Sequence, residues 1–484
     1  MKFNKKAIIC MIMILSMLLG GCGTSLGSSV KKVKLDPDNP TKVTIWHYYN
    51  GDQLEAFNKL IDEFNGSVGK KEGIYVEGSN FGTVNELKDS IGAAVKHRTG
   101  AEAIPNIFAG YADTVYEVDK LGYVVDLKEY LTQKEQDKYI KSYIEEGEFS
   151  GDGSLKIFPT AKSTEVFMLN KTDWNKFAEA TGADLNDLKT IEGVTKTAQA
   201  YYEWTDSQTK KKNDGKAFFG RDALANYFII GAKQLGTEIF SVKDGKVTLN
   251  FDKEVIRKIW DNYYVPFVKG YFAASGKFRS DDINTGNILS FVGSSAGATF
   301  FPDEVIVDDT RSYPIDMEVL EAPEFEGGED YAVQQGAGMA VTKTDEKQMY
   351  ASVQFLKWFT EDEKNIQFSV ASGYLPVTET ANDVKKIEKT TDLTGNNELS
   401  IVKVAIDTVN HNTLYTTKAF ENGTDARNIL EYAMSDKASA DRKTVVKRLK
   451  KGESFDEAVK DFVSDSNFDT WYEATKAELE KVVK

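Results

Sequence analysis

Hydrophobic residues recur with strand and helix periods along the first quarter of the chain. Residues 42–48 alternate β-branched and other side chains, as a strand does, and residues 52–65 carry apolar side chains at every third or fourth position, as an amphipathic helix does. Strand and helix patterns then keep alternating, in residues 73–77, 83–96, 105–110 and 111–121. This order predicts an α/β domain with a parallel sheet.

The alternation continues towards the C-terminus. Residues 165–170 form an apolar strand pattern, residues 288–301 form two strand-like stretches separated by glycines, and residues 334–341 form a strand broken by glycine. Helical spacing predicts helices in residues 171–180, 194–204, 222–235, 252–269 and 348–360. Residues from about 395 to 484 are helical and charged. A chain of this length suffices for two or three domains, each with its own core.

The N-terminus has the pattern of an export signal. Three lysines precede an apolar run over residues 7–19, which is too short to span a membrane and is followed by Gly20, Gly21 and Cys22. The sequence at this point resembles a bacterial lipobox, which implies cleavage before Cys22 and a lipid on that residue. We therefore expect residues 1–21 to be a signal peptide, residues 22–40 to be a flexible tether, and the mature protein to be a Gram-positive-type lipoprotein on the extracellular face of the cell membrane. The alternative is a plain secretory signal with an incidental cysteine.

Composition and charge narrow the classes of function. The chain has 75 acidic and 60 basic residues and a formal net charge of −15, which argues against binding to nucleic acid or to anionic lipid through a basic patch. Cys22 is the only cysteine outside the predicted signal, so we expect no disulfide and no thiol chemistry. His47, His97 and His411 have no metal-binding spacing, and the sequence contains neither a nucleophile elbow nor a Walker loop. No cofactor and no metal are therefore expected.

Six segments, taken in chain order, resemble one protein family. They begin near residue 45 with VTIWHYYNG and EAFNKLIDEFN, continue with PNIFAGYADTVYEVDKLGYVVDL, FPTAKSTEVFMLNKTDW and GAGMAVTKTDEKQMYASVQFLKWFT, and end near residue 380 with SVASGYLPVTETA. In order and content these segments are similar to the extracellular solute-binding proteins of ABC importers, in the large carbohydrate-binding family (family 1). One departure is Leu169, because the family usually has a tyrosine just before the position of Asn170.

The resemblance implies an architecture and a function. The fold would be the two-lobed α/β fold of periplasmic binding proteins, with a mostly parallel sheet flanked by helices in each lobe and a ligand cleft between the lobes. By analogy, lobe one comprises residues 41–160 with 335–390, and lobe two comprises residues 161–334 with 391–484. The protein would be a monomeric sugar-binding receptor and not an enzyme. It would close on an oligosaccharide and deliver it to the permease subunits of an ABC transporter.

The candidate ligand-binding residues are chosen for sugar chemistry. A sugar needs flat apolar faces under its ring C–H groups and planar polar groups for its hydroxyls, and in this fold both should follow strand ends. The candidates are Trp46, Tyr48, Tyr49, Tyr111, Asp113, Lys162, Ser163, Arg221, Phe301, Asp303, Gln335, Gly336 and Tyr374. Some have purely structural alternatives: Trp46 as a core residue, Asp113 as a helix cap, Lys162 as the partner of an acid, and Arg221 as a solvated charge.

Other functions stay open from the sequence alone. A glycerol 3-phosphate or phosphodiester receptor of the same importer class would need two or more of Lys162, Arg221, Arg279 and Arg311 in the cleft. A lipid-anchored glycoside hydrolase would need two carboxyl groups that flank the scissile glycosidic bond, and no motif in the sequence singles out such a pair. A surface scaffold that keeps the receptor fold would have an empty cleft without apolar faces.

Overall fold

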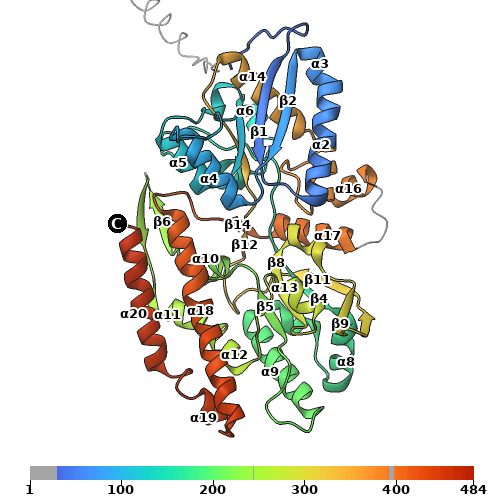
Figure 1. Ribbon diagram of the computed structural model, residues 1–484, viewed down its shortest axis with the longest axis vertical. Coiled ribbons are helices and arrows are strands. Elements are labelled where there is room, and N and C mark those ends of the chain that lie inside the picture. Colours follow the sequence, from blue (N-terminus) through green and yellow to red (C-terminus); the bar gives the residue numbers. More distant parts are fainter. Residues whose placement is uncertain (1–29, 244, 392–396) are drawn as a thin grey trace, which may run out of the picture.

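The computed structural model describes residues 30–243, 245–391 and 397–484, and it has two lobes, each built around a sheet (Figure 1). The predicted signal peptide, Cys22 and residues 22–29 of the predicted tether lie outside the described residues. The rest of that predicted tether contacts lobe one, where the backbone N–H of Lys31 donates to the carbonyl of Glu129 at 2.8 Å. No helix in the described ranges is both long and apolar enough to cross a bilayer.

Lobe one contains a four-stranded sheet in the order β13-β3-β1-β2. β1 (Thr41–His47) pairs in parallel with β2 (Ile74–Asn80) and β3 (Ile107–Gly110), whereas β13 (Gly338–Val341) pairs antiparallel with β3. The surrounding helices are α2 (Gly51–Gly66), α3 (Val68–Glu72), α4 (Val84–Val95), α5 (Ala112–Lys120), α6 (Gln133–Gln136), α7 (Lys141–Glu146), α14 (Glu346–Phe359) and α15 (Asp362–Ser372).

Lobe two contains a four-stranded sheet in the order β11-β4-β8-β5. β4 (Glu165–Asn170) pairs antiparallel with β8 (Ser290–Ser294) and β11 (Met317–Glu321), and β5 (Phe219–Arg221) pairs in parallel with β8. Two-stranded sheets are formed by β6 (Phe240–Lys243) with β7 (Lys246–Leu249), β9 (Glu304–Asp308) with β10 (Arg311–Pro314), and β12 (Tyr331–Val333) with β14 (Thr413–Tyr415). The helices of lobe two are α8 (Lys171–Thr181), α9 (Ile191–Ser207), α10 (Leu224–Gln234), α11 (Lys253–Asp261), α12 (Tyr264–Lys269), α13 (Arg279–Asn284), α17 (Asn397–His411), α18 (Gly423–Lys450), α19 (Phe455–Val459) and α20 (Asp465–Val482), and α16 (Val384–Thr390) contacts both α15 and α17.

In each four-stranded sheet, one strand runs antiparallel to the other three: β13 in lobe one and β4 in lobe two. Each of these strands comes directly after the chain has crossed from the other lobe. The chain crosses from lobe one to lobe two just before β4 and returns just before β13, and the two crossings pair with each other through Ser163 and Gln335. The expected mostly parallel sheet is present in lobe one, but in lobe two, where three strands share a direction, the pairings are mostly antiparallel. In lobe two the reversed strand is central, so only the β5–β8 pairing is parallel.

The apolar run of β4 is explained by burial on both faces. Val166 and Met168 belong to one hydrophobic cluster, and Phe167 and Leu169 belong to another on the opposite face of the sheet. Side chains alternate between the faces of a strand, so a strand covered on both faces reads as continuously hydrophobic. Leu169 is fully buried, which accounts for an aliphatic residue at this position.

Two elements differ from the sequence prediction. The single helix expected over residues 252–269 is divided into α11 and α12, because Pro266 has no N–H for the helical ladder. The second strand expected within residues 288–301 is instead a 3₁₀ helix, Ser295–Phe300, whose first turn is capped by the Ser294 hydroxyl accepting from the N–H of Ala296.

Candidate functional site

A cavity of about 280 Å³ lies between the two lobes, and we call it the interlobe cleft. Its lobe-one wall comes from the first turns of α4 and α5 and from the end of α7, and its lobe-two wall comes from α10, from the first turn of α18 and from residues 334–335 and 416–417. Because α5 and α10 follow β3 and β5, the cleft lies at the carboxyl ends of strands, where open α/β sheets place ligands.

Tyr111 supplies an aromatic face to the lobe-one wall. It is the N-cap residue of α5, its side chain makes no capping hydrogen bond, and 39% of it is exposed. Burial by surrounding protein, together with the neighbouring Tyr374, nevertheless raises the pKa of its hydroxyl. Tyr48 is a neighbour of both Tyr111 and Tyr374. A side chain that is surrounded by protein and still reachable by solvent is suited to stack against a ligand.

Asp113 lies beside Tyr111 in the first turn of α5 and is not the N-cap residue. Its carboxylate packs against lobe two, so closely that a Cβ added at Gly423 would lie 2.5 Å from one carboxylate oxygen. Burial raises the pKa of Asp113 to about 6, although the nearby Arg427 and Lys88 act in the opposite direction. The carboxyl group therefore stands between two cations at the place where the lobes meet.

The burial of Asp113 predicts that its ionised carboxylate lowers the stability of the native state, and that this effect depends on pH. Since the native pKa of Asp113 is about 6 and the unfolded value is lower, the native state holds a proton that the unfolded state releases between about pH 4 and pH 6. Stability contributed by this residue is thus present at low pH and lost as pH rises through that window. We expect Asp113→Asn to melt at a higher temperature than the wild type at pH 7, and the difference to shrink at pH 4.

The measurement is the melting temperature of both proteins between pH 4 and pH 8. Asp309→Asn, in the exposed β9–β10 turn, is the matched control and should track the wild type at each pH. An Asp113→Asn advantage that is equal at pH 4 and pH 7 would show that the ionised carboxylate is not costly in the native state.

Arg427 is the main cation of the lobe-two wall, and sequence reasoning missed it. It lies in the second turn of α18, and its Nη2 donates to Asn226 Oδ1 at 2.8 Å. Asn226 in turn donates to Glu165 Oε1 at 2.9 Å and to Gln335 Oε1 at 3.0 Å. These bonds hold a guanidinium and two side-chain amides in fixed positions, which suits the recognition of hydroxyl pairs.

The lobes also touch directly beside the cleft. Lys88 Nζ of α4 donates to Thr424 Oγ1 of α18 at 3.3 Å, and Lys120 forms an ion pair with Glu421 at 3.0 Å. The first turn of α18 therefore meets α4, and Glu421, just before α18, meets the end of α5. Relative movement of the lobes must change these contacts.

Lys162, Ser163 and Gly336 lie at the crossing between the lobes. The fully buried Lys162 Nζ contacts Glu146 Oε2 at 2.7 Å and donates to the carbonyl of Gly336 at 2.8 Å. Gly336 has φ of 98°, and a Cβ there would lie 3.1 Å from the carbonyl oxygen of Ala161. Lys162 thus has the acid partner that was its structural alternative. Gln335 is the member of this crossing that reaches the cleft.

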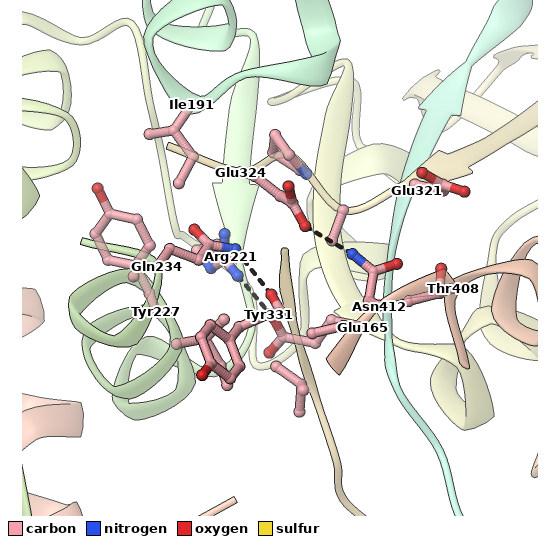
Figure 2. Close-up of a pocket in the computed structure, with 16 residues that line it drawn as sticks. Glu165, Ile191, Arg221, Tyr227, Gln234, Glu321, Glu324, Tyr331, Thr408 and Asn412 are labelled. Carbon is pink, nitrogen blue, oxygen red and sulfur yellow. Dashed lines mark hydrogen bonds and ion pairs between the residues drawn. The ribbon is translucent and has the colours of Figure 1, made fainter. Parts of the chain in front are cut away.

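Arg221 lines a different cavity, inside lobe two, which Figure 2 shows. Its Nη2 pairs with Glu165 Oε2 at 2.6 Å, and its guanidinium lies 5.0 Å from the ring centroid of Tyr227. Across the cavity, Asn412 donates to Glu324 at 2.8 Å, and burial, with Asp330 and Glu321 nearby, raises the pKa of Glu324 to about 7. The cavity measures about 40 Å³, room for water but not for a sugar. Arg221 is therefore a buried ion-pair partner and not a solvated charge.

The remaining candidates lie outside the cleft lining. Trp46 and Tyr49 are buried in the lobe-one core, where Trp46 packs on Phe81 with ring centroids 4.2 Å apart. Phe301 is buried in lobe two and stacks with Phe291, whereas Asp303 is exposed near the start of β9. In the described ranges, no group of three or more His, Cys, Asp or Glu side chains is arranged to hold a metal ion.

Comparison with known proteins agrees with this geometry. Residues 59–395 match the family model described as bacterial extracellular solute-binding protein. The comparison with curated proteins returned no match.

Solved structures match over nearly the whole chain. The cyclic alpha-maltosyl-1,6-maltose binding protein from Arthrobacter globiformis has a TM-score of 0.67 at 18% identity, with 92% of this chain and 100% of that chain covered. UgpB from Mycobacterium tuberculosis in complex with glycerophosphocholine gives 0.65 at 18% identity, with the same coverage. A solute-binding protein from Agrobacterium radiobacter in complex with ribitol gives 0.62, again at 18% identity and with the same coverage. At these identities the likeness establishes the two-lobed fold.

Proposed function

The chain belongs to the bacterial extracellular solute-binding protein family, and we propose that its solute is a carbohydrate held between the two lobes. The protein is a non-enzymatic receptor component of an ABC importer. The ligand would contact the Tyr111 ring and Asp113 from lobe one and Arg427, Asn226 and Gln335 from lobe two. Because the ligand would contact both walls, it would bind the closed arrangement of the lobes more tightly than the open one and would therefore favour closure.

The charge balance of the cleft supports a neutral ligand, and this observation carries the proposal. Of the charged residues in the lining, Lys88 forms an ion pair with Glu117 and Glu146 forms one with Lys162, which leaves Arg427 and Asp113 as two opposite charges. An aromatic face with paired polar groups and no net charge is the chemistry of a sugar site.

The four cations that the sequence offered for an anionic ligand are used elsewhere. Lys162 and Arg221 are buried in pairs with Glu146 and Glu165. Arg279 pairs with Asp282 in lobe two, and Arg311 pairs with Asp308 on the β9–β10 hairpin. None of the four lines the interlobe cleft, which weighs against the glycerol phosphate or phosphodiester alternative.

The volume of about 280 Å³ suits a mono- or disaccharide in this lobe arrangement, and a longer oligosaccharide would need the lobes to separate further. The proposal includes a lipid on Cys22, a monomer on the extracellular face of the membrane, and delivery to permease subunits. It also keeps the lobe assignment of residues 41–160 with 335–390 and residues 161–334 with 391–484.

A thermal-shift screen tests the ligand class. A ligand that binds only the native state stabilises it by about 2.7 kcal/mol at about 100 times its Kd, so a true ligand raises the melting temperature. We expect a shift with at least one neutral mono- or oligosaccharide in a panel that also contains glycerol phosphates, phosphodiesters and amino acids. A shift produced only by phosphate esters would replace the sugar by the anionic alternative. No shift from any compound would favour a scaffold role.

A further inference from the structure

A second cavity, of about 600 Å³, lies in lobe two on the side of its sheet away from the cleft. It is bordered by the segment leading into β5, by the end of α12, by β9 and by the middle of α18, which runs beside α12 (Figure 1). Arg442 of this cavity and Arg427 of the cleft lie on the same helix, so about 15 residues of rise, or about 22 Å, separate them along its axis. We call this second cavity the distal pocket.

The distal pocket is lined by cations, and none of the described residues in its lining is acidic. Lys216, Arg442 and Lys443 line it together with hydroxyl groups such as those of Ser275 and Ser439. Among the described residues, none of the three cations forms an ion pair with a carboxylate. This is unusual for a chain whose net charge is −15.

Arg442 is the central feature of the distal pocket. It is partly buried, and its Nη1 donates to the carbonyl of Val268 at 3.1 Å. Gly270 leaves space for the guanidinium, because a Cβ there would lie 2.2 Å from Arg442 Nη2. Burial lowers the pKa of Arg442, and only the phenol groups of Tyr202 and Tyr271 act against that effect. A desolvated cation without an anionic partner is costly, and a bound anion would remove the cost.

Neighbouring carboxylates are already committed to other partners. Asp282 accepts from the backbone of Ser275 and pairs with Arg279. Asp441, next to Arg442 in the chain, pairs with Lys437 at 2.8 Å and accepts from Tyr264. These two carboxylates therefore do not neutralise the cations of the distal pocket.

We propose that the distal pocket binds a small organic phosphate monoester, independently of the ligand in the interlobe cleft. The planar guanidinium of Arg442 offers paired donors to an oxyanion, and the two lysines add charge. The volume exceeds what inorganic phosphate fills, and Phe267 and Phe272 in the lining provide an apolar surface for the organic part. The pocket is thus a second ligand site in lobe two, apart from the interlobe cleft.

Calorimetric titration with phenyl phosphate tests this site on the purified chain at low ionic strength. We expect phenyl phosphate to bind more tightly than inorganic phosphate, and the neutral analogue phenol not to bind. Arg442→Gln should weaken phenyl phosphate at least about tenfold, since hydrogen bonds to charged groups contribute strongly. Lys447→Gln removes an exposed charge from the same helix outside the pocket and should bind like the wild type.

Two further variants keep the test decisive. Lys443→Gln, at an exposed position, should weaken binding about threefold or more and carries the test if Arg442→Gln fails to fold. Arg427→Gln, in the cleft, should leave phenyl phosphate binding unchanged. The proposal is overturned if the wild type does not bind phenyl phosphate, if Arg442→Gln and Lys443→Gln bind it normally, or if Arg427→Gln abolishes binding.

Discussion

Replacing Lys162 by methionine is expected to lower the free energy of unfolding by about 3–5 kcal/mol. The ammonium group is fully buried and is the cation beside Glu146, whose side chain is only 7% exposed. Methionine fills a similar volume but leaves the Glu146 carboxylate buried without its counter-charge. Removing one partner of a buried pair costs much more than removing both, because the remaining charge stays desolvated. The loss would be a large part of the stability of an ordinary protein.

Chemical denaturation of the wild type and two variants measures this effect. Lys141→Met breaks the ion pair with Glu145 on the same helix, but that lysine side chain is 88% exposed, so no measurable change is expected. The double variant Lys162→Met/Glu146→Gln should recover much of the loss. If Lys162→Met is as stable as Lys141→Met, the buried pair does not hold the crossing between the lobes.

Replacing Arg427 by alanine is expected to weaken sugar binding by about 10- to 150-fold, because a hydrogen bond to a charged group contributes about 1.5–3 kcal/mol. Arg427 is partly exposed in the cleft and donates to Asn226, so its removal leaves the helix core intact. Arg311→Ala is the matched control, because Arg311 is exposed on a hairpin outside the cleft lining. The affinity is measured by calorimetry with the sugar that gives the largest thermal shift.

The sequence was sufficient for most elements around the cleft because their patterns are local. β1, α2 and α5 were predicted within two residues of their observed ends, since each buries one regular apolar pattern. Tyr111 and Asp113 were found because they directly follow a buried strand. The 3₁₀ helix after β8 was not predicted, because Ala and Gly in residues 295–300 do not exclude a strand.

The lobe-two wall could not be predicted in the same way. Arg427 lies in a charged helix whose sequence resembles any solvated helix, and it reaches the cleft only because α18 begins against Asp113. Arg221 is the last residue of β5, at the strand end where the rule places ligand contacts, but it pairs with Glu165 inside lobe two. Which charged side chain faces a ligand is decided by pairings between distant segments, and a single sequence does not contain them.

The most direct test of the central claim, that the ligand bridges both lobes, is calorimetric titration of the same sugar into Tyr111→Ala and Arg427→Ala. Tyr111 makes no capping hydrogen bond, so its truncation leaves α5 intact, and Tyr75→Ala, at a 48% exposed position of β2, is its control. We expect Tyr111→Ala to weaken binding roughly tenfold and Arg427→Ala to weaken it at least as much, with wild-type melting behaviour in both. Wild-type affinity in either variant would mean that the sugar is not held between these two walls.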